Sequence, residues 1–143
     1  MIILDTNVIS ELMKYAPDSH AIAWVDQQDI ATLFVTTITL AEIRYGLHAL
    51  PDGKRKNYLE TAFDSAVLEV FKYSVLAFDN ASSIFYGQLM GKRKKLGQPL
   101  SVLDGQIAAI ARANQMQLAT RNIKDFQNCD LNLVNPFESK LGS

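Results

Sequence analysis

Residues 1–10 read MIILDTNVIS and place an acidic residue directly after a short apolar run. An uninterrupted apolar run of this kind is typical of a strand that is buried on both faces of a sheet. Asp5 ends the run too early for a signal peptide or a membrane span, and no basic segment precedes it. The opening therefore predicts a first buried strand with a carboxylate at its carboxyl end.

Short apolar runs recur along the chain and are separated mostly by segments with helical periodicity. This alternation predicts an α/β fold, a three-layer sandwich in which a central parallel sheet of four or five strands has helices on both faces. The expected strands are residues 2–4, 33–36, 75–78, 117–119 and 131–134. The expected helices are residues 8–15, 19–27, 39–50, 54–71, 81–96 and 102–115.

Length and composition indicate a globular protein with one core. The chain has 143 residues, of which 48% are hydrophobic and 20% are charged, so we expect residues 1–143 to form a single domain. Residues 141–143 (LGS) are interpreted as a possible tag remnant. The net charge of -1 excludes attraction of nucleic acid by the protein's overall field, and leaves local patches. Cys129 is the only cysteine, which excludes an internal disulfide and favours a cytoplasmic location.

Three acidic residues follow predicted strands or open predicted helices. Asp5 follows the first strand, Glu42 lies three residues after the expected N-cap Thr39, and Asp104 lies three residues after the expected N-cap Ser101. Carboxyl ends of parallel strands meet at one edge of a sheet, so we expect the three carboxylates to converge there. Taken singly, Glu42 and Asp104 also fit capping boxes that only stabilise their helices, and that alternative stays open.

Convergence of the three carboxylates requires compensation. Like charges ~5 Å apart repel by about 3 kcal/mol per pair at an effective dielectric constant of ~20. Helix N-termini offset part of this repulsion, and a divalent cation would offset the rest. Ligation by oxygen atoms alone suits Mg²⁺ or Mn²⁺ and not zinc. The pattern thus favours metal-assisted attack of water on a phosphodiester.

Four ordered motifs carry a resemblance that covers nearly the whole chain. They are MIILDTNVISELMK at 1–14, TTITLAEIRYGLHALPDGKR at 36–55, GQPLSVLDGQIAAIARAN at 97–114 and LATRNIKDF at 118–126. With these motifs at these spacings, the chain resembles the PIN-domain ribonuclease toxins of the VapC family, and especially its FitB-like branch.

The resemblance implies a Mg²⁺-dependent endoribonuclease that acts as the toxin of a type II toxin–antitoxin system. It implies RNA as substrate, a VapB-type antitoxin as partner, and a homodimer. The family's acidic positions fall on Asp5, Glu42 and Asp104, with Asp5 and Asp104 as principal metal ligands. A fourth, often acidic, position falls on Asn122, and Asp125 is a possible substitute. One or two metal ions are compatible with this set.

Basic side chains are the candidates for contact with substrate phosphates. Arg44 and Arg121 follow the acidic motifs closely, so either they hold phosphate or they pair with the site acids. Lys94 and Lys95 lie in the basic run 92–95, which either contacts RNA or complements a helix dipole.

Two further functions remain open at this point. A phosphatase of the haloacid dehalogenase type would use a strand-end aspartate as nucleophile, but that pattern needs a second acid where this chain has Asn7. A non-catalytic α/β binding module would use its acids only to cap helices.

Overall fold

A five-stranded parallel sheet forms the centre of the protein, in the order β3-β2-β1-β4-β5. The computed structural model describes residues 1–138. Ile3 of the central strand β1 lies opposite Phe34 of β2 on one side and Leu118 of β4 on the other. The strands are β1 Ile2–Leu4, β2 Leu33–Thr36, β3 Val75–Leu76, β4 Gln117–Ala119 and β5 Leu133–Val134.

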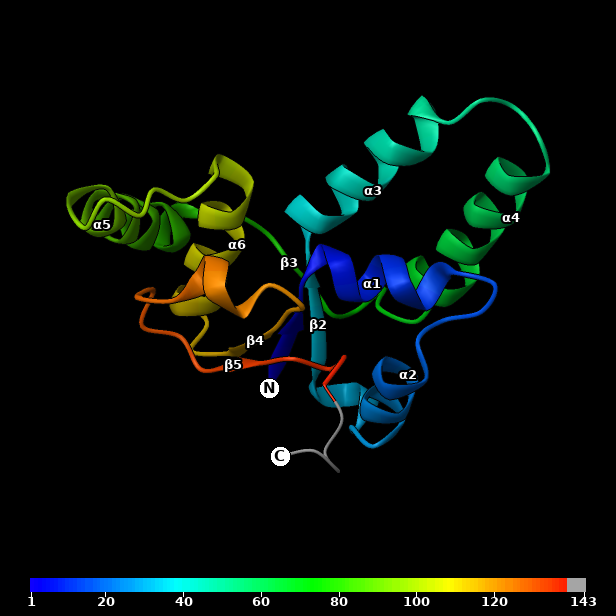
Figure 1. Cartoon of the computed structure of the whole chain (residues 1–143), viewed down its shortest axis with the longest axis horizontal. Coiled ribbons are helices and arrows are strands. Elements are labelled where there is room, and N and C mark those ends of the chain that lie inside the picture. Colours follow the sequence, from blue (N-terminus) through cyan, green and yellow to red (C-terminus); the bar gives the residue numbers. More distant parts are fainter. Residues whose placement is uncertain (139–143) are drawn as a thin grey trace.

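Helices connect all but the last pair of consecutive strands, and β4 and β5 are joined by a loop with one short 3₁₀ turn (Figure 1). The α-helices are α1 Thr6–Met13, α2 Ser19–Asp26, α3 Thr37–Ala49, α4 Lys54–Ala62, α5 Asn80–Lys95 and α6 Val102–Ala113. The shorter segments are the 3₁₀ turns η1 Ile30–Thr32 and η3 Ile123–Phe126, and the π-helix η2 Phe63–Leu68. None of the helices in residues 1–138 has the length and apolar character needed to cross a membrane.

The predicted α/β sandwich is confirmed, and the differences lie at the ends of elements. The edge strands β3 and β5 are shorter than expected, since each pairs with a neighbour on one side only. The helix expected over residues 54–71 is α-helical only to Ala62 and continues as the π-helix η2. The helix expected from Thr39 begins two residues earlier, at Thr37. The proposed tag remnant at 141–143 lies outside the described residues.

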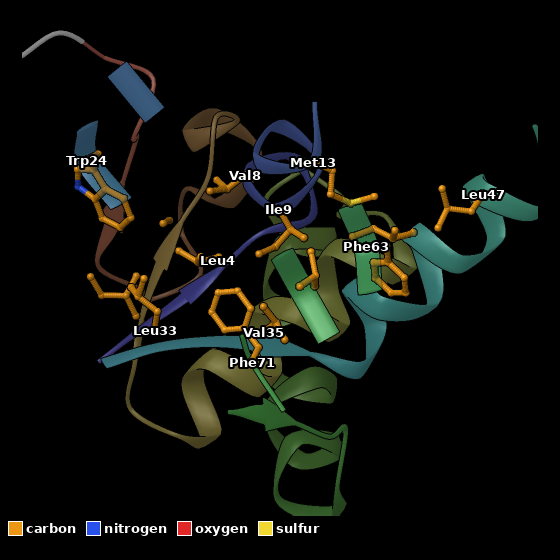
Figure 2. Close-up of a cluster of buried hydrophobic side chains, with 14 residues drawn as sticks. Leu4, Val8, Ile9, Met13, Trp24, Leu33, Val35, Leu47, Phe63 and Phe71 are labelled. Atoms are coloured by element: carbon orange, nitrogen blue, oxygen red, sulfur yellow. The ribbon is translucent and has the colours of Figure 1, made fainter. Parts of the chain in front are cut away.

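The core has two parts, one on each face of the sheet. Ile2 and Leu4 of β1 pack on one face with α1, α2, α3 and η2, as Figure 2 shows for Leu4 with its neighbours. Ile3 points to the opposite face and packs with α6, β4 and the buried side of α5. This alternation follows from the period of two along a strand. Each large aliphatic side chain buried in this way stabilises the fold by about 1.5 to 3 kcal/mol.

The chain order makes the carboxyl end of β1 the expected place for a ligand. The connections from β1 lead first to β2 and β3 on one side, and the chain then crosses to β4 and β5 on the other. β1 is therefore the point where the strand order reverses, and ligands of open α/β sheets bind at the carboxyl ends of strands at such a point. The N-termini of α1 and α3 open directly onto this end of the sheet (Figure 1).

Candidate active site

Asp5 lies at the carboxyl end of β1 and is the N-cap residue of α1. Its Oδ1 accepts a hydrogen bond from the Thr6 amide at 2.8 Å, and its Oδ2 accepts one from the Thr120 hydroxyl at 2.8 Å. The side-chain nitrogen of Asn7 donates to the same Oδ2 at 3.2 Å. Only 4% of Asp5 is exposed. Neutral donors from two segments thus hold this carboxylate in one orientation.

The pKa of Asp5 is raised from 3.8 to about 6. Burial is the main cause, because a carboxylate without water around it is less stable when charged. The negative charges of Asp104 and Glu42 raise the pKa further, while the hydrogen bonds from Thr120 and Thr6 lower it. No cationic side chain is among the causes of this shift, so within the described chain only neutral hydrogen bonds oppose the effect of burial.

Glu42 lies on α3 and faces α1. Its Oε1 accepts a hydrogen bond from the Thr6 hydroxyl at 2.9 Å, and Thr6 Oγ1 lies 3.0 Å from Thr39 Oγ1. Burial raises the pKa of Glu42, the Thr6 hydrogen bond lowers it, and the charge of Asp104 raises it. Glu42 is therefore connected to Asp5 through Thr6, whose amide donates to Asp5 and whose hydroxyl donates to Glu42.

The predicted capping box at Glu42 is wrong. The N-cap of α3 is Thr36, whose hydroxyl accepts a hydrogen bond from the Thr39 amide at 3.1 Å. β2 runs into α3 without an intervening loop, so the cap falls on the last strand residue and Glu42 lies beyond the first turn. Its carboxylate therefore does not cap α3, which removes the capping interpretation of this residue.

Asp104 lies in the first turn of α6, where the predicted cap is confirmed. The Ser101 hydroxyl accepts a hydrogen bond from the Asp104 amide at 3.2 Å. Burial raises the pKa of Asp104, interaction with the Ser101 side chain lowers it, and the charge of Asp125 raises it. A capping role alone does not account for a carboxylate placed against other carboxylates.

The structure brings the three predicted acids together. Each of Asp5, Glu42 and Asp104 has a raised pKa, and the charges of Asp104 and Glu42 act on Asp5 while that of Asp104 acts on Glu42. Within residues 1–138, no lysine, arginine or histidine forms an ion pair with any of the three. We refer to Asp5, Glu42 and Asp104 as the acidic cluster.

The acidic cluster offers carboxylate oxygens, the type of donor that hard divalent cations prefer. In the described part of the chain, no group of three or more acidic, histidine or cysteine side chains is placed so that it could hold a metal ion by itself. A cation of the Mg²⁺ type needs fewer protein ligands, because it binds through one or two carboxylates and keeps several waters. Structural zinc needs four protein ligands of nitrogen and sulfur type. The donor set therefore suits a hard, hydrated cation.

Asn122 and Asp125 occupy the loop after β4. The Asn122 amide donates to Thr120 Oγ1 at 3.1 Å, so this loop reaches Asp5 through a single hydroxyl. The Asn122 side chain makes no hydrogen bond with the described residues, and it is exposed. Asp125 lies within η3 without capping it through its side chain, and its charge acts on Asp104.

Arg121 does not pair with the acidic cluster. Its Nη2 lies 3.1 Å from Oε1 of Glu11, a carboxylate on α1 that also binds Lys14 at 3.0 Å. The guanidinium carbon lies 3.7 Å from the ring centroid of Phe137. The alternative that Arg121 neutralises the site acids is therefore wrong, and its role in substrate binding stays a prediction.

The other predicted basic residues lie elsewhere. The guanidinium of Arg44 lies over the ring of Phe63, in a hollow between α3 and α4–η2 that contains no member of the acidic cluster. Lys94 and Lys95 are exposed at the end of α5, as expected. Within the same run, Arg93 is buried and donates to the carbonyl oxygens of residues 98, 125 and 127, so this part of the run is structural.

Sequence reasoning missed the three residues that orient the acids. The donors to Glu42 and Asp5 are Thr6, Asn7 and Thr120. Each lies within two residues of a predicted site residue. The signal was present in Asp5-Thr6-Asn7 and Thr120-Arg121-Asn122, two short polar stretches that follow neighbouring strands β1 and β4.

Comparison with known proteins adds a family and several relatives. The family model described as PIN domain matches residues 2–130. The chain is 44% identical over 138 residues to "VapC ribonuclease Y4jK" of Sinorhizobium fredii, covering 96% of this chain and 99% of that protein. It is 35% identical over 137 residues to "Toxin FitB" of Neisseria gonorrhoeae, covering 96% of this chain and 99% of that protein.

Solved structures agree with the sequence relatives. "Structure of FitAB bound to IR36 DNA fragment" matches with a TM-score of 0.90 at 35% identity, covering 98% of both chains. "Crystal structure of VapBC2 from Rickettsia felis bound to a DNA fragment from their promoter" matches with a TM-score of 0.80 at 27% identity, covering 94% of this chain and 98% of that chain.

Proposed function

Because the chain belongs to the PIN-domain family, we propose that it is the endoribonuclease toxin of a toxin–antitoxin pair and that its acidic cluster is the active site. The observation that carries the site is the meeting of Asp5, Glu42 and Asp104 without a cationic partner in the described chain. The enzyme class follows from a relative that is named as a ribonuclease and that matches over 96% of this chain and 99% of its own length.

The partner is a VapB-type antitoxin. The matching structures are titled as FitAB, VapBC2 and VapBC-1, and the titles of the first two state that they are bound to a DNA fragment. A homodimer and a cytoplasmic location belong to the same proposal. The free, buried thiol of Cys129 is compatible with a reducing compartment.

Asp5 and Asp104 are the principal ligands of the proposed Mg²⁺ ion, and Mn²⁺ would replace it. Glu42 completes the negative set, and the amide oxygen of Asn122 is available to a coordinated water. With Asn122 in place of a fourth acid, the cluster carries three negative charges, which favours one firmly bound ion. A bound divalent cation supplies the positive charge that activates water and stabilises the leaving oxygen of the phosphodiester.

The chain's own residues prepare the site for this chemistry. Thr120 and Asn7 donate to Asp5 Oδ2 and keep its Oδ1 on the Thr6 amide. Thr6 donates to Oε1 of Glu42, which leaves Oε2 without a hydrogen bond from the described residues. Lys94, Lys95 and Arg44 are the proposed contacts to RNA phosphates, which position the strand without reading its bases.

Neither alternative function gains support from the geometry. An aspartate-nucleophile phosphatase needs an acid at position 7, whereas the Asn7 nitrogen donates to Asp5 there. A module whose acids only cap helices does not fit Glu42, which lies outside the cap of α3.

The direct test incubates the purified protein with total RNA, with and without Mg²⁺, and sequences the new RNA ends. The expected result is a defined set of cuts that needs Mg²⁺ and is absent with Asp5→Asn. Glu69→Gln changes an exposed acid that directly follows η2 and pairs with Lys72, so it serves as the matched control and should cleave normally. Uncut RNA with the wild-type protein at millimolar Mg²⁺ would contradict the proposal.

A further inference from the structure

A hollow of about 360 Å³ lies in the loop after β4, which is linked to Asp5 through the Thr120 hydroxyl. Its volume lies within the range of small-molecule sites, roughly 300 to 1,000 Å³. It begins at Asn122, whose amide donates to the hydroxyl that holds Asp5. The side chains that matter are Arg121, Asn122, Lys124, Asp125, Asn135 and Glu138.

Arg121 is held as a fixed planar surface at this hollow. Glu11 binds one of its terminal nitrogens, and the Phe137 ring lies against one face of the guanidinium at 3.7 Å. Phe137 is not part of the lining of the hollow, whereas Arg121 is, and 47% of the Arg121 side chain is exposed. The face of the guanidinium opposite Phe137 is thus the one available to the hollow.

The charges around the hollow balance. Arg121 and Lys124 are positive, and Asp125 and Glu138 are negative. Such a balance does not suit a free phosphate, but it does suit a neutral, planar group with hydrogen-bonding edges. The side-chain amide of Asn122 makes no hydrogen bond with residues 1–138, so it can both donate to and accept from such an edge.

Nucleobases have these properties. Proteins that recognise single-stranded RNA stack unpaired bases on aromatic rings and on arginine guanidinium planes. The ammonium of Lys124 forms no ion pair with the described residues, so it is free to meet a backbone phosphate beside a stacked base.

We propose that this hollow binds one base of single-stranded RNA next to the phosphodiester that is cut, with the base stacked on Arg121 and the adjoining phosphate on Lys124. The inference rests on the proposed ribonuclease function. It assigns Arg121 a base-stacking role in place of the bidentate phosphate contact predicted from sequence, because Glu11 and Phe137 already fix the guanidinium.

The experiment compares binding of two fluorescent octanucleotides, a single-stranded RNA and an abasic ribose–phosphate chain of equal length. Binding is measured in the Asp5→Asn background with Mg²⁺, so that no cleavage occurs. We divide the dissociation constant of the abasic chain by that of the RNA. This ratio reports contacts to bases, because contacts to phosphates affect both dissociation constants equally. We expect the parent protein to bind the RNA with bases more tightly.

Arg121→Lys keeps the charge but loses the planar face, and should reduce this ratio by about 5-fold to 100-fold, the range for loss of one base stack. Lys124→Ala should weaken binding of both oligonucleotides equally and leave the ratio unchanged. Phe137→Leu, which retains the guanidinium but removes its support, should reduce the ratio by a smaller factor, and covers the case in which Arg121→Lys does not fold.

The outcomes separate the two proposals. An unchanged ratio in both Arg121→Lys and Phe137→Leu would overturn the base site. The same result together with weakened antitoxin binding would assign the hollow to a peptide. Cleavage of RNA by the wild-type protein in Mg²⁺ is measured separately, so absence of cleavage counts against the ribonuclease function and not against base stacking.

Discussion

Asp5 and Glu11 are two buried carboxylates at either end of α1, six positions apart, and they behave oppositely. Glu11 accepts from Lys14, Arg121 and the Asp18 amide, and these partners together outweigh its burial, so its pKa is lowered. Burial raises the pKa of Asp5 to about 6, and the charges of Asp104 and Glu42 add to this effect, because the neutral donors to Asp5 lower the pKa less than burial raises it. Burial alone therefore does not decide the protonation state of a carboxylate, because its hydrogen-bond donors and neighbouring charges also change its pKa. Glu11 has two cationic partners in the described chain, whereas Asp5 has none, as expected of a ligand of the proposed cation.

The largest expected effect is on catalysis. Asp5→Asn and Asp104→Asn should each lower the rate of RNA cleavage by at least about 100-fold, the scale for loss of one preorganised electrostatic contact. The reason is that either change removes a principal ligand of the proposed ion. Initial rates on a defined RNA in Mg²⁺ provide the measurement, with Glu69→Gln as control. Near-normal rates in both variants would place the chemistry elsewhere.

The next largest effect is a gain of stability without metal. The folded pKa of Asp5 lies above its unfolded value of 3.8, so its stabilising contribution is complete below pH 3.8 and is lost as the pH rises through about 6. In EDTA at pH 8, Asp5→Asn should therefore raise the free energy of unfolding by up to about 3 kcal/mol. Urea unfolding at pH 8 and pH 4 checks this, because the gain should vanish at pH 4. A loss of stability at pH 8 would favour a capping role for Asp5.

Glu11 should show the opposite sign. Glu11→Gln removes the charged acceptor of Lys14 and Arg121, and should lower the free energy of unfolding at pH 8 by about 1 to 3 kcal/mol. Because the pKa of Glu11 is lowered in the folded state, its contribution is present above its unfolded pKa and is lost as the pH falls through the folded value. The same urea series measures it. Equal signs for Glu11→Gln and Asp5→Asn would break the comparison.

Much of this architecture is readable from the sequence, and what is not depends on distant contacts. The bounds of β1, β2 and β4 match the predicted ones because each is a short, mostly apolar stretch that pairs with a neighbouring strand on both sides. The predicted start of α3 is wrong, because the N-cap is Thr36 and not Thr39. Threonines at 36, 37 and 39 are all suitable N-cap residues, and the local sequence does not distinguish among them. The carbonyl oxygens that bind Arg93 lie 5 to 34 positions away, and the carboxylate that binds Arg121 lies 110 positions away, so no local pattern reveals most of these contacts.

Thr120 carries the smallest predicted effect. Thr120→Val removes the hydroxyl that donates to Asp5 Oδ2, and its loss should lower cleavage by about 10-fold to 100-fold, as for other groups that orient a metal ligand. Because that hydrogen bond lowers the pKa of Asp5, the acidic limb of the pH–rate profile should also move to higher pH. Thr120→Ser retains the hydroxyl and should retain both the rate and the profile. An unshifted profile in Thr120→Val would show that the hydroxyl only supports packing.

The central claim is that the acidic cluster binds a divalent cation, since the described chain provides no cationic partner for it. The dependence of the free energy of unfolding on Mg²⁺ concentration tests this claim most directly. The free energy of unfolding is measured at pH 8 across a Mg²⁺ series. The wild-type protein should gain about 2.7 kcal/mol at 100 times the dissociation constant of the ion, and Asp104→Asn should lose most of this dependence while Glu69→Gln retains it. A wild-type stability that does not change with Mg²⁺ would contradict the account.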